Sequence, residues 1–410
     1  MDLIIKNIKT LVQIDESHRP YVAGKEMANL NTLPDAWLAI TGGKISSYGS
    51  MSECPETDSP VLDASGKLLM PAFCDSHTHL VYAGSREIEY IDKIRGLSYE
   101  EIAKRGGGIN NSARLLRNST EEDLFEQAMK RINEIISKGT GAVEIKSGYG
   151  LETGAELKML RVIRKIKESS PITVKSTFLG AHSVPLEYKG RQSEYVDLLI
   201  SDMLPKVADE GLADYVDVFC DRGFFTVDET DRILEAAAKY GITPKIHANE
   251  LDYSGGIQVG VKHGARSVDH LEFTGEDEIE VLRDSGTMPT LLPGAAFFLG
   301  MDWAPARKII DSGLPLALAS DYNPGSSPSG DMKFIMSLAC ITMRMLPEEA
   351  IHATTINSAY AMGVENELGT ITIGKKANLI LTKEITGLEF LPYAYTTNLI
   401  DKVILNGKII

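Results

Sequence analysis

Between about residue 68 and residue 354, short apolar and β-branched runs alternate with segments of helical periodicity. This alternation is typical of a parallel β/α architecture. Eight strands in series fit a (β/α)8 barrel of the TIM type better than a doubly wound sheet of about five or six strands. The predicted strands are residues 67–74, 141–146, 172–178, 215–220, 243–247, 267–270, 287–292 and 314–319.

The two ends of the chain have a different pattern. Residues 1–66 and 364–410 alternate apolar and polar residues around turns such as Gly42-Gly43, which is typical of paired strands. Neither end has enough strands to be stable alone. We therefore predict a small composite β-sandwich domain formed by both termini, and a barrel domain over residues 67–363.

The composition limits the possible partners. The 410 residues carry a net charge of -15, with 43% hydrophobic and 24% charged residues, as in an ordinary globular protein. Nucleic acids and anionic membranes both require a basic face, which an acidic chain does not favour. The expected partner is therefore a small molecule.

The sequence also bears on the compartment. Residues 1–9 carry charge too early for a secretory signal. The most apolar later stretch, residues 291–300, contains Pro293 and Gly294 and is too short to cross a bilayer. The four cysteines are scattered and form no Cys-x-x-Cys pair, which favours a reducing compartment. We expect a cytoplasmic protein without a transmembrane helix.

Residues that can bind metal follow several predicted strands. His77 and His79 follow the first strand, His247 ends the fifth, and Asp321 follows the eighth. Residues i and i+2 of a strand point to the same side, and the active site of such a barrel lies at the carboxyl ends of its strands. We therefore expect these side chains to converge on one divalent ion, such as zinc, with an open coordination position.

This ligand pattern resembles that of the amidohydrolase superfamily, whose members also add a small β-domain from both chain ends. Many members hold two metals through a carboxylated lysine or a glutamate at the fourth strand. Here the fourth strand ends at Cys220-Asp221, and Lys175 lies inside the third strand. This departure predicts one divalent metal ion per subunit, zinc or iron.

Further motifs narrow the resemblance to members that hydrolyse the cyclic amide of 4-imidazolone-5-propanoate to N-formimidoyl-L-glutamate in histidine degradation. The motifs are Ser147-Gly-Tyr149-Gly150, Phe178-Leu-Gly-Ala-His182, Ile246-His247-Ala-Asn-Glu250, Asp269-His270-Leu-Glu272 and Ser320-Asp321-Tyr-Asn323-Pro-Gly325-Ser326. The likeness covers nearly the whole chain. It implies a metal-activated water, a small-molecule substrate with a carboxylate, and a homodimer.

The resemblance also implies catalytic roles. Glu250 would orient or deprotonate the water and pass a proton to the leaving nitrogen. Asp321 would bind metal and share that proton, and His270 would stabilise the developing oxyanion. Taken singly, Glu250 could instead be a helix N-terminal carboxylate, and His270 could be a hydrogen-bonded structural histidine.

The propanoate of such a substrate needs a cation. Arg86, nine residues after the histidine pair, suits a bidentate carboxylate contact, although by itself it could be a solvated loop charge. The other residues expected to bind substrate are Tyr149, His182, Glu250, Asn323, Gly325 and Ser326.

Two other functions stay open. Superfamily deaminases that act on aminated heterocycles use the same metal ligands, and release of ammonia without ring opening would indicate such an enzyme. A catalytically silent barrel would have lost metal ligands, and all four are present here.

Two local patterns predict structure near the site. Thr153-Gly-Ala-Glu156 is typical of a capping box at a helix start. The glycine run over residues 105–108 has no Gly-Lys-Ser/Thr after it, so we expect a mobile loop that covers the substrate.

Overall fold

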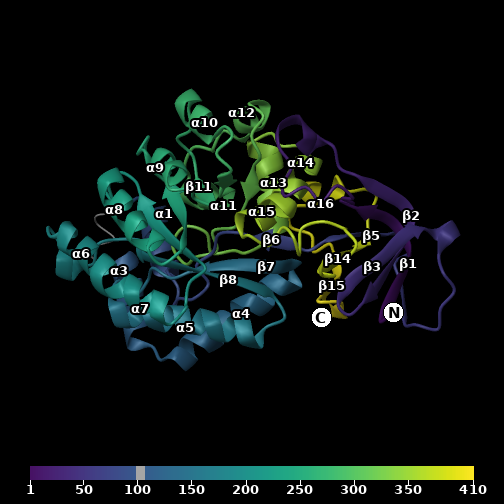
Figure 1. Ribbon diagram of the computed structural model, residues 1–410, viewed down its shortest axis with the longest axis horizontal. Coiled ribbons are helices and arrows are strands. Elements are labelled where there is room, and N and C mark those ends of the chain that lie inside the picture. Colours follow the sequence, from purple (N-terminus) through teal and green to yellow (C-terminus); the bar gives the residue numbers. More distant parts are fainter. Residues whose placement is uncertain (98–106) are drawn as a thin grey trace.

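Parallel strands form a barrel in the order in which they occur along the chain (Figure 1). The structure is a computed structural model that describes residues 1–97 and 107–410. Within these residues the barrel has eight strands, which confirms the predicted (β/α)8 class. They are β6 (Phe73–Asp75), β7 (Thr140–Lys146), β8 (Thr173–Ala181), β9 (Tyr215–Cys220), β10 (Thr243–Ala248), β11 (Ser267–His270), β12 (Met288–Leu291) and β13 (Ala317–Leu318).

The first and last barrel strands meet where the candidate metal ligands lie. A parallel bridge joins Thr78 to Tyr322. The His79 N–H donates to the Tyr322 carbonyl at 2.9 Å, and the Asp321 N–H donates to the His77 carbonyl at 3.0 Å. These bonds hold the segment after β6 against the segment after β13.

Helices surround the barrel and follow the strands in the chain. Helix α4 begins at a capping box in which Thr120 and Asp123 exchange hydrogen bonds. The described helices are α1 (Glu87–Ile94), α3 (Ile109–Asn118), α4 (Glu121–Ser137), α5 (Thr153–Ser169), α6 (Gln192–Leu198), α7 (Leu204–Asp209), α8 (Val227–Ala238), α9 (Gly256–Lys262), α10 (Glu276–Leu282), α11 (Pro293–Leu299), α12 (Ala306–Asp311), α13 (Met332–Thr342), α14 (Pro347–Thr354), α15 (Ile356–Ala361) and α16 (Phe390–Tyr393).

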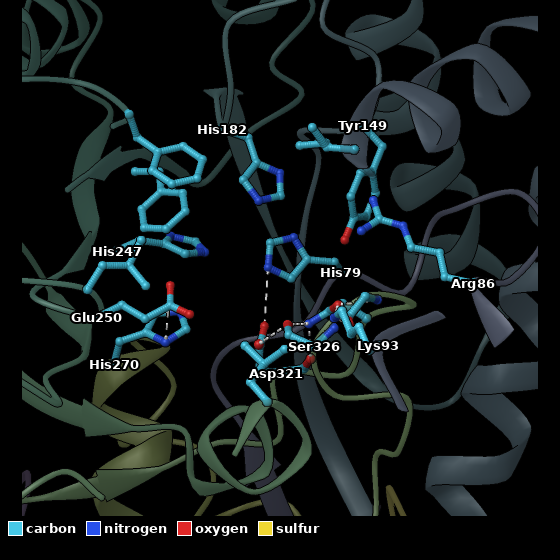
Figure 2. Close-up of a pocket in the computed structure, with 17 residues that line it drawn as sticks. His79, Arg86, Lys93, Tyr149, His182, His247, Glu250, His270, Asp321 and Ser326 are labelled. Atoms are coloured by element: carbon cyan, nitrogen blue, oxygen red, sulfur yellow. Dashed lines mark hydrogen bonds and ion pairs between the residues drawn. The ribbon is translucent and has the colours of Figure 1, made fainter. Parts of the chain in front are cut away.

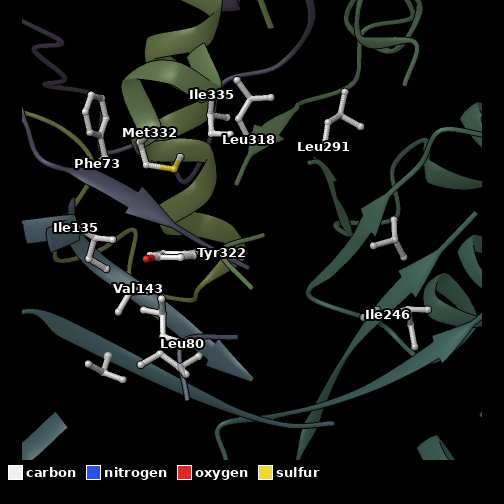
Figure 3. Close-up of a cluster of buried hydrophobic side chains, with 14 of the residues drawn as sticks. Phe73, Leu80, Ile135, Val143, Ile246, Leu291, Leu318, Tyr322, Met332 and Ile335 are labelled. Carbon is white, nitrogen blue, oxygen red and sulfur yellow. The ribbon is translucent and has the colours of Figure 1, made fainter. Parts of the chain in front are cut away.

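The main hydrophobic core lies between the barrel strands and these helices. Phe73 and Val143 from neighbouring strands belong to the same buried cluster as Ile135 of α4 and Met332 and Ile335 of α13 (Figure 3). Apolar side chains on both sides of a strand produce the nearly continuous apolar runs that parallel sheets require.

Both chain ends lie in a second, mixed sheet, on the right in Figure 1. A separate buried cluster that includes Ile5, Leu38, Leu379 and Ile404 stabilises it. This confirms the expected β-domain from both termini. Its strands are β1 (Leu3–Val12), β2 (Thr32–Thr41), β3 (Lys44–Ser50), β4 (Val61–Asp63), β5 (Lys67–Pro71), β14 (Leu379–Glu384), β15 (Ile400–Leu405) and β16 (Lys408–Ile409).

The predicted first barrel strand, residues 67–74, consists of two strands. β5 pairs with β1 and β14 of the terminal sheet, and only β6 pairs with β7 of the barrel. Both parts are buried and apolar, so hydrophobicity alone does not separate them. We therefore propose that the terminal domain extends to Pro71.

Two further expectations concern covering and membrane segments. Residues 105 and 106 of the predicted covering loop lie outside the described part of the chain, so its role over the substrate stays a prediction. Across residues 1–97 and 107–410, no helix has the length and apolar character needed to cross a membrane.

Candidate active site

Three histidines converge at the carboxyl ends of the barrel strands. His77 and His79 follow β6, and His247 lies in β10. All three are buried, and one ring nitrogen of each lies within 4.8 Å of the other two. This spacing suits three ligands of a single ion.

Asp321 follows β13 and faces the same point. Its Oδ1 lies 3.5 Å from His77 Nε2 and 3.4 Å from His79 Nε2. Asp321 has a φ of 53°, a left-handed conformation that is uncommon outside glycine and is concentrated at functional sites. Burial opposes the ionisation of Asp321. The hydrogen bond from His79 and the charges of the neighbouring imidazoles outweigh burial and lower the pKa of Asp321 below its usual value.

A carboxylate lies behind each of two candidate ligands. His77 Nδ1 pairs with Asp269 Oδ2 at 2.6 Å, and His247 Nδ1 pairs with Asp217 Oδ2 at 2.9 Å. The Nε2 atoms of both rings are buried and have no hydrogen-bond partner among the described residues. A carboxylate at Nδ1 fixes the tautomer that presents a lone pair at Nε2, as in known metal sites.

The protonation of His77 fits this arrangement. Burial, followed by the positive charge of Lys146, lowers the pKa of His77 well below its ordinary value. A neutral imidazole is the form that binds a metal ion. The residues present therefore fit a divalent cation.

A cavity of about 370 Å3 opens in front of these residues. In Figure 2, His247, Glu250 and His270 line one side and Arg86 and Tyr149 line the other. His79 and Asp321 lie between the two sides. The cavity thus places the candidate metal ligands between acid/base groups and a cation.

Glu250 lies in a turn that Asp221 stabilises. The Asp221 carboxylate accepts hydrogen bonds from the N–H groups of Glu250, at 2.7 Å, and Leu251, at 2.9 Å. Burial, together with the charges of Asp321 and Asp221, raises the pKa of Glu250 to about 8. A carboxyl group with a pKa near neutrality can both accept and return a proton.

His270 lies beside Glu250 at the end of β11. Its Nδ1 is 3.8 Å from Glu250 Oε2 and 4.0 Å from Glu272 Oε2. Burial lowers the pKa of His270 to about 3, so the ring is neutral near pH 7. A φ of 88° gives this residue an uncommon backbone conformation as well.

Arg86 lies at the opposite side of the cavity. Its Nε donates to Ser112 Oγ at 2.9 Å, and its guanidinium carbon is 5.8 Å from the centre of the Tyr149 ring. Its Nη2 is buried without a hydrogen-bond partner in the described part of the chain. This cation can therefore accept an anionic ligand.

Asn323 organises the turn that follows Asp321. Its side-chain oxygen accepts from the N–H groups of Gly325, at 2.7 Å, and Ser326, at 2.8 Å. Its amide nitrogen donates to the Asp321 carbonyl at 2.7 Å, and the Ser326 hydroxyl donates to Asp321 Oδ2 at 3.2 Å. The backbone donors of this turn are therefore already used within it.

Tyr149 and His182 surround His79. The His182 and His79 rings stack with centroids 5.2 Å apart, and the Tyr149 and His79 centroids are 5.8 Å apart. His182 Nδ1 lies 3.0 Å from the Gly148 carbonyl. The predicted site residues other than His77 thus line one cavity, and His77 lies buried behind it with its ring 5.3 Å from that of His79.

The predicted capping box at Thr153 is wrong. The Thr153 hydroxyl donates to Asp202 at 2.6 Å. The buried Glu156 carboxylate instead accepts from the N–H groups of Gly148, Gly150 and Leu151, at 3.0, 2.7 and 2.9 Å. Three backbone N–H groups of the loop solvate this carboxylate, whereas a capping box would offer it only one. The Glu156 carboxylate thereby holds the loop that carries Tyr149.

Several residues around the cavity were not predicted from the sequence. Lys93 lines it and lies 3.4 Å from the Gly325 carbonyl; its position two helical turns after Arg86 was the available signal. Phe219 and Phe224 also line it, with ring centroids 4.0 Å apart. The carboxylates of Asp217 and Asp269, which pair with His247 and His77, appear in the sequence only as charged residues inside apolar strands.

Comparisons with known proteins agree with this architecture. The sequence model of the amidohydrolase family matches residues 68–410. The chain is 54% identical to the imidazolonepropionase of Christiangramia forsetii and 53% identical to that of Flavobacterium psychrophilum, over 100% of each chain in both cases.

Solved structures support the fold. An atrazine chlorohydrolase from Arthrobacter aurescens TC1, solved in complex with zinc, superposes with a TM-score of 0.72 at 16% identity, over 99% of this chain and 94% of that one. This likeness shows a shared fold, while the family follows from the matched sequence model and the full-length relatives. The chain belongs to the amidohydrolase family and, within it, to the imidazolonepropionases.

Proposed function

We propose that this chain hydrolyses the ring amide of 4-imidazolone-5-propanoate. Water adds to the ring carbonyl carbon, the carbon–nitrogen bond breaks, and the nitrogen takes up a proton to give N-formimidoyl-L-glutamate. Relatives named imidazolonepropionase that match over the full length support this reaction. The single structural observation behind it is that the Nε2 atoms of His77 and His247 are buried without a hydrogen-bond partner in the described structure, with the Asp321 carboxylate 3.5 Å from that of His77.

The ion would be held by His77, His79, His247 and Asp321. When bound, a divalent ion supplies a Lewis acid that lowers the pKa of water and polarises a carbonyl. Zinc and iron are both compatible with imidazole and carboxylate ligands.

A single ion per subunit is the proposed stoichiometry. Lys175, which lies inside the third barrel strand, pairs with Asp214 at 3.0 Å. The fourth barrel strand, β9, ends in a buried thiol, Cys220, and the next residue, Asp221, is occupied by the N–H groups of the Glu250 turn. Both observations support one ion.

Proton transfer would depend on Glu250. Its carboxylate would accept a proton from the attacking water and return it to the ring nitrogen that leaves the carbonyl. Asp321, which lies between the two sides of the cavity, would share that proton. His270, neutral at pH 7, would donate a hydrogen bond to the oxyanion.

The propanoate would bind at the other side of the cavity. The guanidinium of Arg86 would form the charge-assisted contact, with hydrogen bonds from Tyr149 and His182. Lys93, half-buried beside Arg86, adds a second positive charge. Asn323, Gly325 and Ser326 would shape the wall between this cation pair and Asp321.

Turnover assays separate this function from its alternative. The purified protein is assayed with 4-imidazolone-5-propanoate and with a panel of aminated purines and pyrimidines, and ring opening and ammonia release are both measured. We expect ring opening of the first substrate alone. Ammonia release from an aminated base without ring opening would instead identify a deaminase.

We further propose that the protein acts in the cytoplasm as a homodimer. The four cysteines of the described chain are free thiols, which supports a reducing compartment. Light scattering coupled to size exclusion tests the assembly: a mass near twice 44.8 kDa is expected, and a mass near 44.8 kDa would refute the dimer.

A further inference from the structure

Lys146 contacts both carboxylates that hold the candidate ligand rings. Its ammonium lies 2.8 Å from Asp217 Oδ2 and 3.7 Å from Asp269 Oδ2. Asp217 Oδ2 is the oxygen that pairs with His247 Nδ1, and Asp269 Oδ2 is the oxygen that pairs with His77 Nδ1. One side chain therefore connects the supports of two metal ligands.

Strand alternation brings Lys146 to this point. It is the last residue of β7, and Glu144, two residues earlier, faces the same side of the strand. Lys146 and Glu144 are fully buried, and Lys146 Nζ lies 2.7 Å from Glu144 Oε1. The barrel interior at this level is thus polar, unlike the branched apolar layers usual in such barrels.

The buried cluster contains more negative than positive groups. Three carboxylates, from Glu144, Asp217 and Asp269, face the ammonium groups of Lys146 and Lys245. Buried charges of this kind persist only when they are paired and hydrogen-bonded. Without Lys146, Asp217 would lose its ammonium partner. Asp269 would lose the nearer of its two ammonium neighbours and keep only that of Lys245.

We propose that Lys146 is a positioning residue for the metal site. By holding Asp217 and Asp269 in place, it would fix the tautomer and direction of the His247 and His77 rings, so that both Nε2 lone pairs point to one ion. This inference rests on the metal site proposed above.

Lys245 provides a matched control. It is equally buried, pairs with Glu144, and donates to the Ser76 carbonyl at 2.7 Å. Its ammonium lies 4.0 Å from Asp269 Oδ2, farther than that of Lys146. Its removal therefore disturbs the same cluster with less effect on the carboxylates behind the rings.

The test compares E144Q/K146M with E144Q/K245M. Each double variant removes one carboxylate charge and one ammonium charge, so the net charge near the ion is unchanged. Zinc dissociation constants are measured on the metal-free proteins by competition with a chromophoric chelator, and thermal unfolding checks the fold. We expect E144Q/K146M to bind zinc about 10- to 100-fold more weakly than the wild type, and E144Q/K245M to bind close to the wild type.

A spectroscopic readout accompanies the affinity. Cobalt(II) bound in place of zinc reports ligand geometry through its visible absorption, which should change in E144Q/K146M and stay wild-type in E144Q/K245M. Equal zinc affinities and equal spectra for the two variants would overturn the positioning role. A wild-type protein that binds no zinc would instead refute the proposed metal site itself.

The proposal can still be tested if a double variant does not fold. Where E144Q/K146M fails to fold, K146Q and K245Q replace the double variants, because glutamine keeps a hydrogen-bond donor in each position. The same order of affinities is expected, with K146Q the weaker. Equal affinities of these two variants would again overturn the proposal.

Discussion

Gly325 and Arg86 lie in close contact across the wall of the cavity. A β carbon built on Gly325 would lie 2.5 Å from Arg86 Nη1, far inside ordinary van der Waals separation. On its other side, the Arg86 Nε donates to Ser112 Oγ. The guanidinium therefore occupies the space that a side chain at residue 325 would need, and from there it can meet a substrate carboxylate.

Gly325→Ala should weaken substrate binding. The new methyl group would displace the guanidinium, and losing a hydrogen bond to a charged group costs about 1.5–3 kcal/mol. We therefore expect a rise in KM of roughly 10- to 100-fold with a smaller change in kcat. Gly154→Ala is the control, because no atom lies within 4 Å of its added carbon; an unchanged KM in G325A would contradict the proposed contact.

Arg86→Met should also act mainly on KM. It removes the charge and the bidentate geometry but keeps an unbranched side chain in place of the aliphatic part of arginine. Arg86→Lys should have an intermediate effect, since lysine keeps the charge without the fork. Steady-state kinetics on both variants and on Lys93→Met would rank the two cations, with Arg86 the more important. A normal KM in R86M would exclude the anchoring role.

Glu250→Gln should reduce turnover by about 10²- to 10⁴-fold, because a positioned acid/base group contributes that much. Metal content should stay the same, since Glu250 is not a proposed ligand. Inductively coupled plasma mass spectrometry and steady-state kinetics check both expectations. Unchanged turnover would remove Glu250 from the mechanism.

The pH profile gives a second test of Glu250. Its pKa is raised from 4.5 to about 8 by burial, so the base form accumulates as the pH rises, and a bound cation opposes this shift. Wild-type kcat/KM should therefore increase with pH along a limb whose midpoint lies between 4.5 and about 8. This rise of kcat/KM with pH should vanish in E250Q. If E250Q still shows the rise, a group other than Glu250 causes it.

Glu156→Gln should loosen the loop that carries Tyr149. The carboxylate accepts three backbone hydrogen bonds, and an amide presents only one oxygen to them. Leaving buried donors unpaired costs about 1–3 kcal/mol each, so the free energy of unfolding should fall by at least that amount. Chemical denaturation measures it, and an exposed carboxylate variant, Glu168→Gln, is the control. Equal stability of E156Q and the wild type would refute this support.

Much of the fold was predictable because each barrel strand is a short buried run between helical segments. The His77-x-His79 pair and the ends of β10 and β13 were predictable for the same reason, since parallel strands end at one rim. The break between β5 and β6 was not, because residues on both sides are equally apolar and only their hydrogen-bond partners differ.

Long-range pairing also explains what the sequence did not reveal at the site. Glu156 follows a threonine at capping-box spacing, yet it serves a loop that folds back from β7. Lys146 lies in a strand next to ordinary apolar residues, and its partners come from β9 and β11. Alternate charges inside a buried strand are a usable signal of such a cluster, but they do not identify the partner strands.

Metal content measured together with turnover is the most direct test of the proposed site. We expect one zinc or iron ion per wild-type chain, loss of turnover when a chelator removes it, and recovery when the ion is restored. His247→Asn should lose both the ion and the activity. Two divalent ions per chain, or full ring-opening activity in protein shown to be metal-free, would contradict the single-ion site at His77, His79, His247 and Asp321.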